Sequence, residues 1–543
     1  MKMINASALC GKDSLGRELP AVGAEPAFSQ RQVGLFYFMC HDSKDAMYPG
    51  AAFFEDVLDA YDKETLGSGS SPFYDYPYGI PFYWGKPLFG TYQTIDEWVM
   101  RKHVELFVAA GIDFLVIDAT NLNSFVEPAL LLMRILDEGQ RDSLPVPKIA
   151  FYTNTDSGVR IREIYEGIYA KNLFPDTWYC ADGKPVIIGI AEQTDPELLA
   201  YFHFKNSQWP GMPVQENAFP WIDFGWPQTV YAAEDGTERI VSVSVAQNSD
   251  KTACFSQNFL YGSDGCHGRS YHNGDGHITA DSYKYGYNFA EQWEGARRLS
   301  PDTVFVTGWN EWTAGVWTHD SREHPVAIFD CLNAEYSRDI EPMQGGYGDG
   351  YYFQLIEQVR KFKGIRSDEK VSLPASFDNL TTAGVSRKSQ TFDGEICDDS
   401  LRNIIVRTEV EKVGENYIFT AVTKTSIDPD DRIGDWMRLL VNTKVPEVFE
   451  FCFNMRTVDD SRTVAAIRKN EQWERIGLID YQLSENRIRL TVPASMIGTA
   501  DQLYIKWVDS RKHCHTGDDF YLYGSAAPIG RLFYRVDLAA DSR

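Results

Sequence analysis

Polar side chains follow several apolar runs of this 543-residue chain, at points where buried strands are expected to end. Glu311 is the most informative of them. It lies in the stretch GWNEWTAGVW, between Trp309 and Trp312 and beside Asn310, directly after the run TVFV. Indole rings stack on the C–H faces of sugars, and an asparagine amide can bond a sugar hydroxyl. This pattern predicts a carboxylate that acts on a sugar, whereas the alternative is a salt bridge at a strand end.

Glycoside hydrolysis requires a second carboxyl group, as nucleophile or to activate water. Asp118 is the first candidate, because it ends FLVIDATN, the most regular apolar run in the chain. A purely structural role at the strand end is its alternative. Glu341, in the segment EYSRDIEP, is the next candidate, together with Asp339. Glu192 and Asp223 are weaker candidates for the same role.

Other polar and aromatic residues near strand ends are candidate contacts to the substrate. Arg338 could orient an acid or bind a substrate carboxylate, or it could simply pair with Asp339 or Glu341. Arg269 and His272 lie in the Gly-rich loop 261–277, which could equally be a plain surface loop. The full set of expected substrate-binding residues is Trp309, Asn310, Trp312, Trp226, Asn121, Asn154, Gln247, Arg269, His272, Arg338 and Asp339.

These residues are far apart in the sequence, so the fold must bring the strand ends together. The sequence predicts such a fold. Apolar runs of strand length alternate with amphipathic, helix-like segments, a pattern typical of parallel strands covered on both faces. Strands are expected at 33–38, 114–121, 148–154, 185–190, around 218–228, at 240–247, 303–312 and 326–333. Helices are expected at 94–110, 126–138, 157–171, 195–205, 281–299 and 351–364.

Eight such units predict a (β/α)8 barrel with insertions, whose chemistry lies at the C-terminal ends of the strands. A doubly wound open sheet is the alternative, but no Gly-rich phosphate loop follows a strand. Glu311 then ends the seventh strand. Thr94 and Glu97 form a capping-box pattern for the first helix, and Gly111 ends it. The aromatic, Gly- and Pro-rich loop 68–90 is long enough to predict a functional role.

The chain divides into four predicted regions. An N-terminal lead-in packing on the barrel covers 1–30, the barrel 31–366, a polar linker 367–390, and a C-terminal domain 391–543. Short alternating segments with little helix predict a β-sandwich for the last region. GDWMRLLVNT, with FDGEI and NYIFTAVTKT before it, resembles family 9-like carbohydrate-binding modules. Trp436, Trp473 and Trp507 could then stack on sugar, but core packing is the favoured interpretation of each.

Composition excludes several classes of function. The formal net charge is −25 without a strong basic run, which argues against nucleic-acid or membrane partners. Nine scattered cysteines without a CxxC pair predict neither a disulfide framework nor a zinc site. The start lacks a signal-peptide core and no run reaches membrane-spanning length, so a cytoplasmic protein is expected. No metal or cofactor motif is present, and the expected partner is a carbohydrate.

The WNEW motif at a strand end of a barrel resembles family 99 of glycoside hydrolases, the endo-acting mannosidases and mannanases. FVTGWNEW, EYSRDIEP, KYGYNFAEQWE and GLFYF with FYWGKPLFG also resemble large bacterial proteins of the WbsX type, over most of residues 15–365. In family 99 a second catalytic Glu lies three residues after the first. Here that position is Ala314, so the family's paired-Glu mechanism and its mannose specificity do not carry over.

We therefore expect a bacterial glycoside hydrolase that cleaves an oligo- or polysaccharide with two carboxylates at the barrel rim. Glu311 is one carboxylate, and Asp118 or Glu341 is the other. Two alternatives remain open. The first is a non-catalytic glycan-binding protein on a degenerate barrel, which Ala314 would fit. The second is a metal-dependent hydrolase that uses Asp118, His272 and Asp275.

Overall fold

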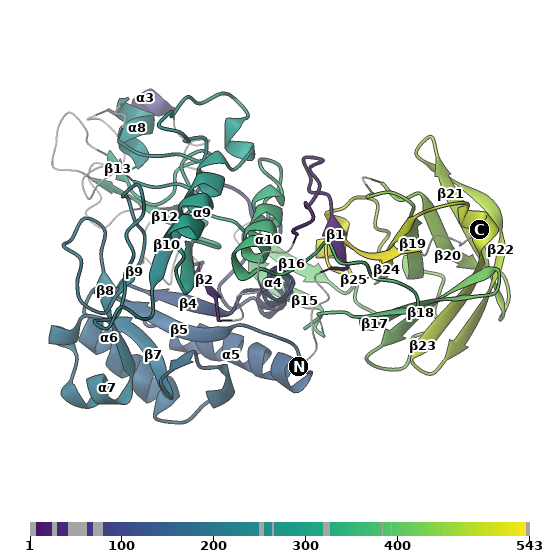
Figure 1. Ribbon diagram of the computed structural model, residues 1–543, viewed down its shortest axis with the longest axis horizontal. Coiled ribbons are helices and arrows are strands. Elements are labelled where there is room, and N and C mark those ends of the chain that lie inside the picture. The colour runs from purple at the N-terminus through teal and green to yellow at the C-terminus, as the bar shows by residue number, and fades with distance from the viewer. Residues whose placement is uncertain are drawn as a thin grey trace.

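The computed structural model describes most of the chain and divides it into two halves (Figure 1). An α/β domain lies on the left of the view, and an antiparallel β domain lies on the right. Parts of the predicted lead-in and of the loops 68–90 and 261–277 lie outside the described residues. These residues are 7–23, 30–41, 62–68, 80–248, 255–262, 265–318, 326–382, 384–391, 394–446 and 448–538.

The α/β domain is a nearly closed (β/α)8 barrel of parallel strands. The strands neighbour one another in chain order, and the last pairs with the first in parallel, from Thr303↔Gln32 to Val306↔Leu35. The ring lacks a ladder only between its sixth and seventh strands. The strands are β2 (Gln32–Tyr37), β4 (Phe114–Ala119), β5 (Lys148–Thr153), β7 (Lys184–Gly189), β8 (His203–Gln208), β9 (Ala218–Pro220), β10 (Ile240–Ser244) and β11 (Thr303–Thr307).

Two strand predictions were wrong, although the barrel is confirmed. β8 was predicted to be the end of a helix, because HFKNSQ has no apolar run. Its polar residues are held locally, as Lys205 donates to Asn217 Oδ1 at 2.7 Å. The predicted eighth strand at 326–333 is not part of the barrel. Glu311 therefore follows the eighth strand, β11, which lies beside β2.

The predicted helices are present with shifted ends. Asp96, and not Thr94, caps the first barrel helix, because its side chain accepts from Val99 N, while Thr94 Oγ1 donates to Met39 O. Gly111 ends this helix in the left-handed conformation, as predicted. The barrel-domain helices are α3 (Lys63–Leu66), α4 (Glu97–Ala110), α5 (Val126–Arg141), α6 (Ser157–Ile164), α7 (Pro196–Tyr201), α8 (Phe255–Tyr261), α9 (Tyr287–Leu299) and α10 (Gly350–Lys363). No helix in the described part of the chain is long and apolar enough to cross a membrane.

A small antiparallel sheet follows the barrel strands. It consists of β3 (Ile80–Tyr83), β12 (Thr313–Thr318) and β13 (Val326–Ile328), in the order β13-β12-β3. β12 begins two residues after Glu311, and β13 is the segment predicted to be the eighth barrel strand. This sheet therefore brings the residues after β13 to the same region as the end of β11.

The C-terminal domain is the predicted β-sandwich. Its antiparallel strands form one 12-stranded sheet that folds over its own core, in the order β1-β26-β24-β19-β20-β21-β22-β23-β18-β17-β14, with β25 on β24. Described cysteines are free throughout the molecule. The strands from the predicted sandwich region are β16 (Gly394–Asp398), β17 (Ile405–Val413), β18 (Asn416–Thr423), β19 (Asp435–Asn442), β20 (Phe451–Thr457), β21 (Arg462–Lys469), β22 (Gln472–Ser484), β23 (Arg487–Pro493), β24 (Gln502–Ser510), β25 (Ser525–Ala527) and β26 (Leu532–Asp537). The two short helices α11 (Ala494–Ile497) and α12 (Asp519–Leu522) complete this domain.

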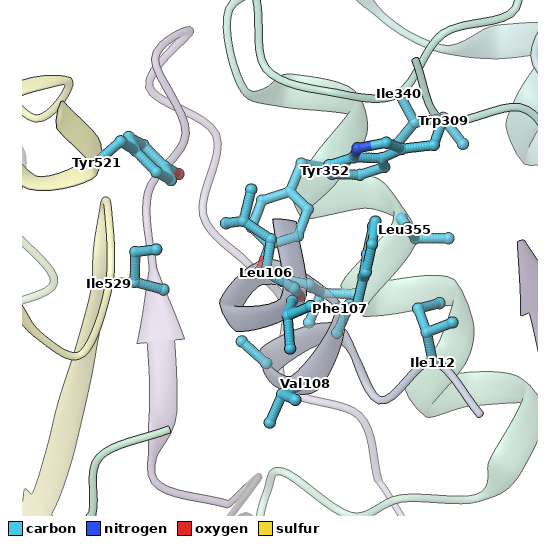
Figure 2. Packing of buried hydrophobic residues seen from close by; sticks show 14 of the residues in the cluster. Leu106, Phe107, Val108, Ile112, Trp309, Ile340, Tyr352, Leu355, Tyr521 and Ile529 are labelled. Atoms are coloured by element: carbon cyan, nitrogen blue, oxygen red, sulfur yellow. Dashed lines mark hydrogen bonds between the residues drawn. The ribbon is translucent and has the colours of Figure 1, made fainter. Parts of the chain in front are cut away.

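The predicted lead-in and linker both contribute strands beyond the barrel. β1 (Leu9–Gly11) pairs with β26, so the lead-in belongs in part to the C-terminal sheet. Within 367–390, β14 (Ala375–Asp378) pairs with β17, and β15 (Arg387–Thr391) begins a hairpin with β16. Arg387 bonds Asp96 at the start of α4, at 2.7 Å. Figure 2 shows Tyr521 and Ile529 of the C-terminal domain beside the β1 segment.

Candidate active site

One pocket lies at the C-terminal ends of the barrel strands. Its volume is about 260 Å³, close to the lower end of the range for small-molecule pockets, which is about 300 Å³. Its walls combine aromatic rings with carboxyl and amide groups. The lining residues are Phe36, Phe38, Asp118, Thr120, Asn121, Trp209, Pro210, Trp221, Phe224, Asn248, Glu311, Phe329 and Asp330.

Three carboxyl groups meet in this pocket, namely Asp118, Glu311 and Asp330. Glu311 and Asp330 are both bonded by Arg338, which is fully buried. Its Nη2 donates to Glu311 Oε2 at 3.2 Å and to Asp330 Oδ1 at 2.8 Å. The guanidinium group lies over the ring of Trp221, with its carbon 5.2 Å from the ring centroid. The buried Arg338 thus holds two of the three pocket carboxyl groups in place.

Two of these carboxyl groups, those of Glu311 and Asp118, have raised pKa values. The pKa of Glu311 is raised well above its ordinary value, chiefly by burial and next by the negative charge of Asp330, against the opposing effect of Arg338. The pKa of Asp118 is raised to about 6, again chiefly by burial. The Thr120 N–H, which donates to Asp118 Oδ1 at 3.0 Å, opposes that shift. Perturbed carboxyl groups in a pocket are typical of functional sites.

The neighbours of Glu311 in the WNEW motif have structural roles and do not line the pocket. Trp309 is fully buried among Phe107, Tyr352 and other residues of α4 and α10 (Figure 2). Trp312 is also fully buried and stacks on Trp84, with ring centroids 4.8 Å apart. These two indoles are therefore closed to a sugar. They fix the backbone on either side of Glu311.

Asn310 fastens the end of β11 to the end of β2. Its Oδ1 accepts from Phe38 N at 2.9 Å, and its Nδ2 donates to Phe38 O at 3.1 Å and to Tyr92 Oη at 3.1 Å. The side chain is fully buried. Asn310 thereby sets the position of Glu311 and Phe38, which both line the pocket, and it does not contact the pocket itself.

Glu341 is completely buried away from the pocket. It accepts hydrogen bonds from Tyr92 Oη at 2.8 Å and from Trp312 Nε1, and its Oε1 lies 2.9 Å from His103 Nε2. A carboxylate with these partners and no exposure cannot reach a glycosidic bond. The structure therefore does not place Glu341 in the role of second carboxylate.

Asp339 and Arg269 stabilise the backbone at Glu311 through hydrogen bonds. Asp339 accepts from Glu311 N and from Trp84 Nε1, the latter at 2.9 Å. Burial raises its pKa to about 7 against the opposing charge of Arg269. Arg269 is fully buried between Tyr347 and Tyr351 and donates to Asp339 O at 2.8 Å. Both residues orient the Glu311 backbone and neither lines the pocket.

The remaining predicted contacts lie outside the pocket, except Asn121, which lines it. Asn154 accepts from Ser207 Oγ at 3.0 Å. Gln247 is buried and donates to Asp223 O at 2.6 Å, so it links two loops. Trp226 is 50% exposed, and His272 stacks on Tyr287, with ring centroids 4.5 Å apart.

The weaker candidates for a second carboxylate are also outside the pocket. Asp223 is used in a turn, where it accepts from Gly225 N and Thr229 N. Glu192 is exposed on the short helical turn after β7. Neither carboxyl group faces Glu311 across the cavity.

The site residues chosen from the sequence did not include the aromatic walls, Asn248 or Asp330. Trp209 follows β8 and Trp221 follows β9, and their rings stack with centroids 4.7 Å apart. Correct assignment of β8 would have revealed Trp209 as a strand-end residue. Trp221 lay in the segment that suggested Trp226 instead. Asn248, after β10, presents a buried Oδ1 that has no hydrogen-bond partner among the described residues.

The sandwich tryptophans considered as sugar-stacking candidates are mostly core residues, as the favoured interpretation predicted. Trp507 is fully buried, and Trp436 is 5% exposed with its Nε1 bonded to Asp428 O. Trp473 is half-buried beside the guanidinium of Arg468. Core packing therefore accounts for two of the three.

The residues proposed for a metal-dependent reaction do not form a metal-binding cluster among the described residues. Of the described His, Cys, Asp and Glu side chains, the set close enough to hold an ion is Asp182, His203 and Glu238, which does not include Asp118, His272 or Asp275. Glu238 is also bonded by the ammonium group of Lys205. None of these three residues lines the pocket of Glu311.

No family model and no curated protein matches the chain. Among solved structures it is similar to the GH99 endo-alpha-mannosidase from Bacteroides thetaiotaomicron in complex with BIS-TRIS-propane, at 13% identity and a TM-score of 0.34, over 61% of this chain and 97% of that one. Another structure of that mannosidase gives 15% identity, a TM-score of 0.34 and the same coverage. A glycoside hydrolase-like protein gives 15% identity and a TM-score of 0.34 over 63% of this chain and 97% of that one.

The family named from the WNEW motif is thus also the family of two of these structures. Such low identities and TM-scores do not establish a shared activity. The functional conclusion for this chain rests on the residues of its own pocket.

Proposed function

We propose that this protein is a glycoside hydrolase that cleaves an oligo- or polysaccharide at the pocket of Glu311. The observation that carries the proposal is the meeting of three carboxyl groups with a wall of aromatic rings at the C-terminal rim of a (β/α)8 barrel. This face is where enzymes with this fold place their chemistry. Aromatic rings suit the C–H faces of a sugar, and carboxyl groups suit its hydroxyls and its glycosidic oxygen.

Glu311 is the proton donor in this proposal. Its raised pKa, caused first by burial and then by the negative charge of Asp330, favours the protonated carboxylic acid. Only 12% of the side chain is exposed, and it lines the pocket, where a bound ligand can contact it. The acid protonates the leaving oxygen as the glycosidic bond breaks.

The second carboxyl group is Asp118 or Asp330, since both line the pocket with Glu311. It either attacks the anomeric carbon or removes a proton from an attacking water. Activity should therefore fall at high pH as Glu311 loses its proton, and at low pH as the second carboxylate gains one.

Substitution of Glu311 tests the proposal. Glu311→Gln keeps the size of the side chain and removes the proton donor, so hydrolysis of natural glycans should fall by about 10²–10⁴-fold. Glu192→Gln is the matched control, because it makes the same change at the same rim outside the pocket. Both variants are assayed on a panel of aryl glycosides and polysaccharides, with circular dichroism to confirm folding. Equal activity of the two variants would refute the role of Glu311.

A non-catalytic glycan-binding protein is the second candidate, and Ala314 favours it. The chain lacks the second Glu that the family 99 resemblance would place there. Calorimetry with the same glycans separates the two candidates. Saturable binding without turnover by the wild-type protein, in the whole panel, would establish the binding protein instead of the enzyme.

A further inference from the structure

We propose that Asp330 is the nucleophile of the reaction and forms a covalent glycosyl ester, while Arg338 holds it beside Glu311. This inference rests on the proposed function and extends it to a stated second carboxylate. Asp330 follows β13 in the small antiparallel sheet and is not at the end of a barrel strand. It nevertheless lines the same cavity as Glu311.

The distance between the two carboxyl groups is bounded by the atom that they share. Arg338 Nη2 lies 3.2 Å from Glu311 Oε2 and 2.8 Å from Asp330 Oδ1. These two oxygens are therefore at most about 6 Å apart. Enzymes that form a covalent glycosyl intermediate have carboxyl groups about 5–5.5 Å apart, whereas direct attack by water needs about 6.5–9.5 Å. The bound on this pair of oxygens is compatible with attack by Asp330 itself.

Electrostatics also favours Asp330 over Asp118 as the partner of Glu311. Of the surrounding negative charges, Asp330 acts most strongly on Glu311 and Asp118 acts less strongly than Asp339. The Asp330 side chain is 36% exposed, so a sugar can reach it. Arg338 bonds one of its oxygens, and the other accepts no hydrogen bond from the described residues. That free oxygen is available to attack.

The reaction then proceeds in two displacements. An Asp330 oxygen supplies an electron pair to the anomeric carbon, the bond from this carbon to the leaving oxygen breaks, and the Glu311 proton passes to that oxygen. Water next attacks the anomeric carbon of the ester. Its proton returns to Glu311, and the ester C–O bond breaks to restore the Asp330 carboxylate. Two inversions leave the anomeric configuration unchanged.

Arg338 is a positioning residue in this scheme. Its guanidinium group bonds both carboxyl groups in the ground state, and it stays buried between the rings of Trp221 and Phe255. Asp118, which also lines the cavity, is left as a polar contact to the sugar ring. The three acids therefore have three different roles.

Trapping of the intermediate tests the proposal. The aryl glycoside that the wild-type protein hydrolyses fastest is prepared as its 2-deoxy-2-fluoro form with a dinitrophenyl leaving group. The fluorine slows both displacements, and the activated leaving group lets the first one proceed. Mass spectrometry of the intact protein should show addition of one fluorosugar, and peptide mapping should place it on Asp330. An adduct on Asp118, or a product of inverted configuration, would overturn the assignment.

A rescue experiment separates a nucleophile from a merely structural residue. Asp330→Ala should lower hydrolysis of the parent aryl glycoside by about 10³-fold or more. Added azide should restore release of the aryl group and yield a glycosyl azide of inverted configuration. Asp118→Ala, the matched control, should yield no such azide product. The same product from Asp118→Ala, and none from Asp330→Ala, would refute the role of Asp330.

The two levels of the proposal fail in different ways. Unimpaired hydrolysis by Glu311→Gln, or no turnover by the wild-type protein, would remove the proposed function and this inference with it. Turnover that needs Glu311 but gives an adduct elsewhere would remove only the nucleophile assignment.

Discussion

Asp118 should destabilise the folded protein at neutral pH, and its removal should show this directly. Burial raises the pKa of this carboxyl from 3.8 to about 6. The folded protein therefore binds the proton more tightly than the unfolded chain does. Stability that comes from this proton is complete below about pH 4 and is lost as the pH rises through about 6. An asparagine at this position does not ionise, so it escapes the loss.

The magnitude follows from the size of the shift. A change of about 2 pKa units corresponds to about 3 kcal/mol at pH values above about 6. This value is a ceiling, because Asp118 keeps partial contact with solvent in the pocket. In Asp118→Asn the Thr120 N–H can still donate to the side-chain oxygen, so that hydrogen bond is retained. The variant should be more stable than the wild type by up to about 3 kcal/mol at pH 8 and nearly equal to it at pH 4.

Thermal unfolding of the barrel measures this difference. A gain of that size should raise Tm by about 4 °C at pH 8. Asp176→Asn, an exposed aspartate near the other end of the barrel, is the control and should shift Tm little at either pH. The reasoning is refuted when Asp118→Asn behaves like the control at pH 8, or when its effect is the same at both pH values.

Three further predictions address the neighbours of Glu311. Arg338→Lys should lower kcat more than it raises KM, because an ammonium group does not reproduce the planar guanidinium that bonds both acids, and the loss of buried contacts should lower Tm. Trp209→Ala should raise KM by about 3–10-fold through loss of an aromatic wall, whereas Trp226→Ala, outside the pocket, should leave KM unchanged; equal effects would contradict the pocket assignment. Glu341→Gln should lower Tm, because it weakens the contact with His103, yet kcat of the folded fraction should stay within a few-fold of wild type; loss of activity comparable to Glu311→Gln would return Glu341 to the reaction.

The barrel could be predicted from sequence because most of its strands are continuous apolar runs between amphipathic helices. β8 escaped this criterion, since its polar side chains are satisfied by local partners such as Asn217 and Glu238. Because β8 was omitted, each later barrel strand was assigned a number one too low. It also hid Trp209, which becomes a strand-end residue only when β8 is recognised.

The motif at the end of β11 correctly predicted where the site lies, but not which residues of the motif line the pocket. Glu311 lies in the pocket as expected, but Trp309, Asn310 and Trp312 face the protein interior. Sequence alone could not separate these roles, because an indole that stacks on a sugar and one that packs on Trp84 or Phe107 occupy the same type of position. Long-range packing decides between them, and the sequence does not display it.

The proposed role of Asp330 is compatible with the absence of an acid at residue 314. β12 and β13 are antiparallel, with Val316 opposite Ile328 and Thr318 opposite Val326. The ladder ends at Val316 and Ile328, and an extension of its register by two residues would bring Asp330 opposite Ala314. Residues opposite each other on an antiparallel pair have Cβ atoms about 4.5–5.5 Å apart, so a carboxyl group carried on either strand reaches nearly the same space. In the proposed mechanism, Asp330 supplies from the segment after β13 the second carboxylate that residue 314 does not provide.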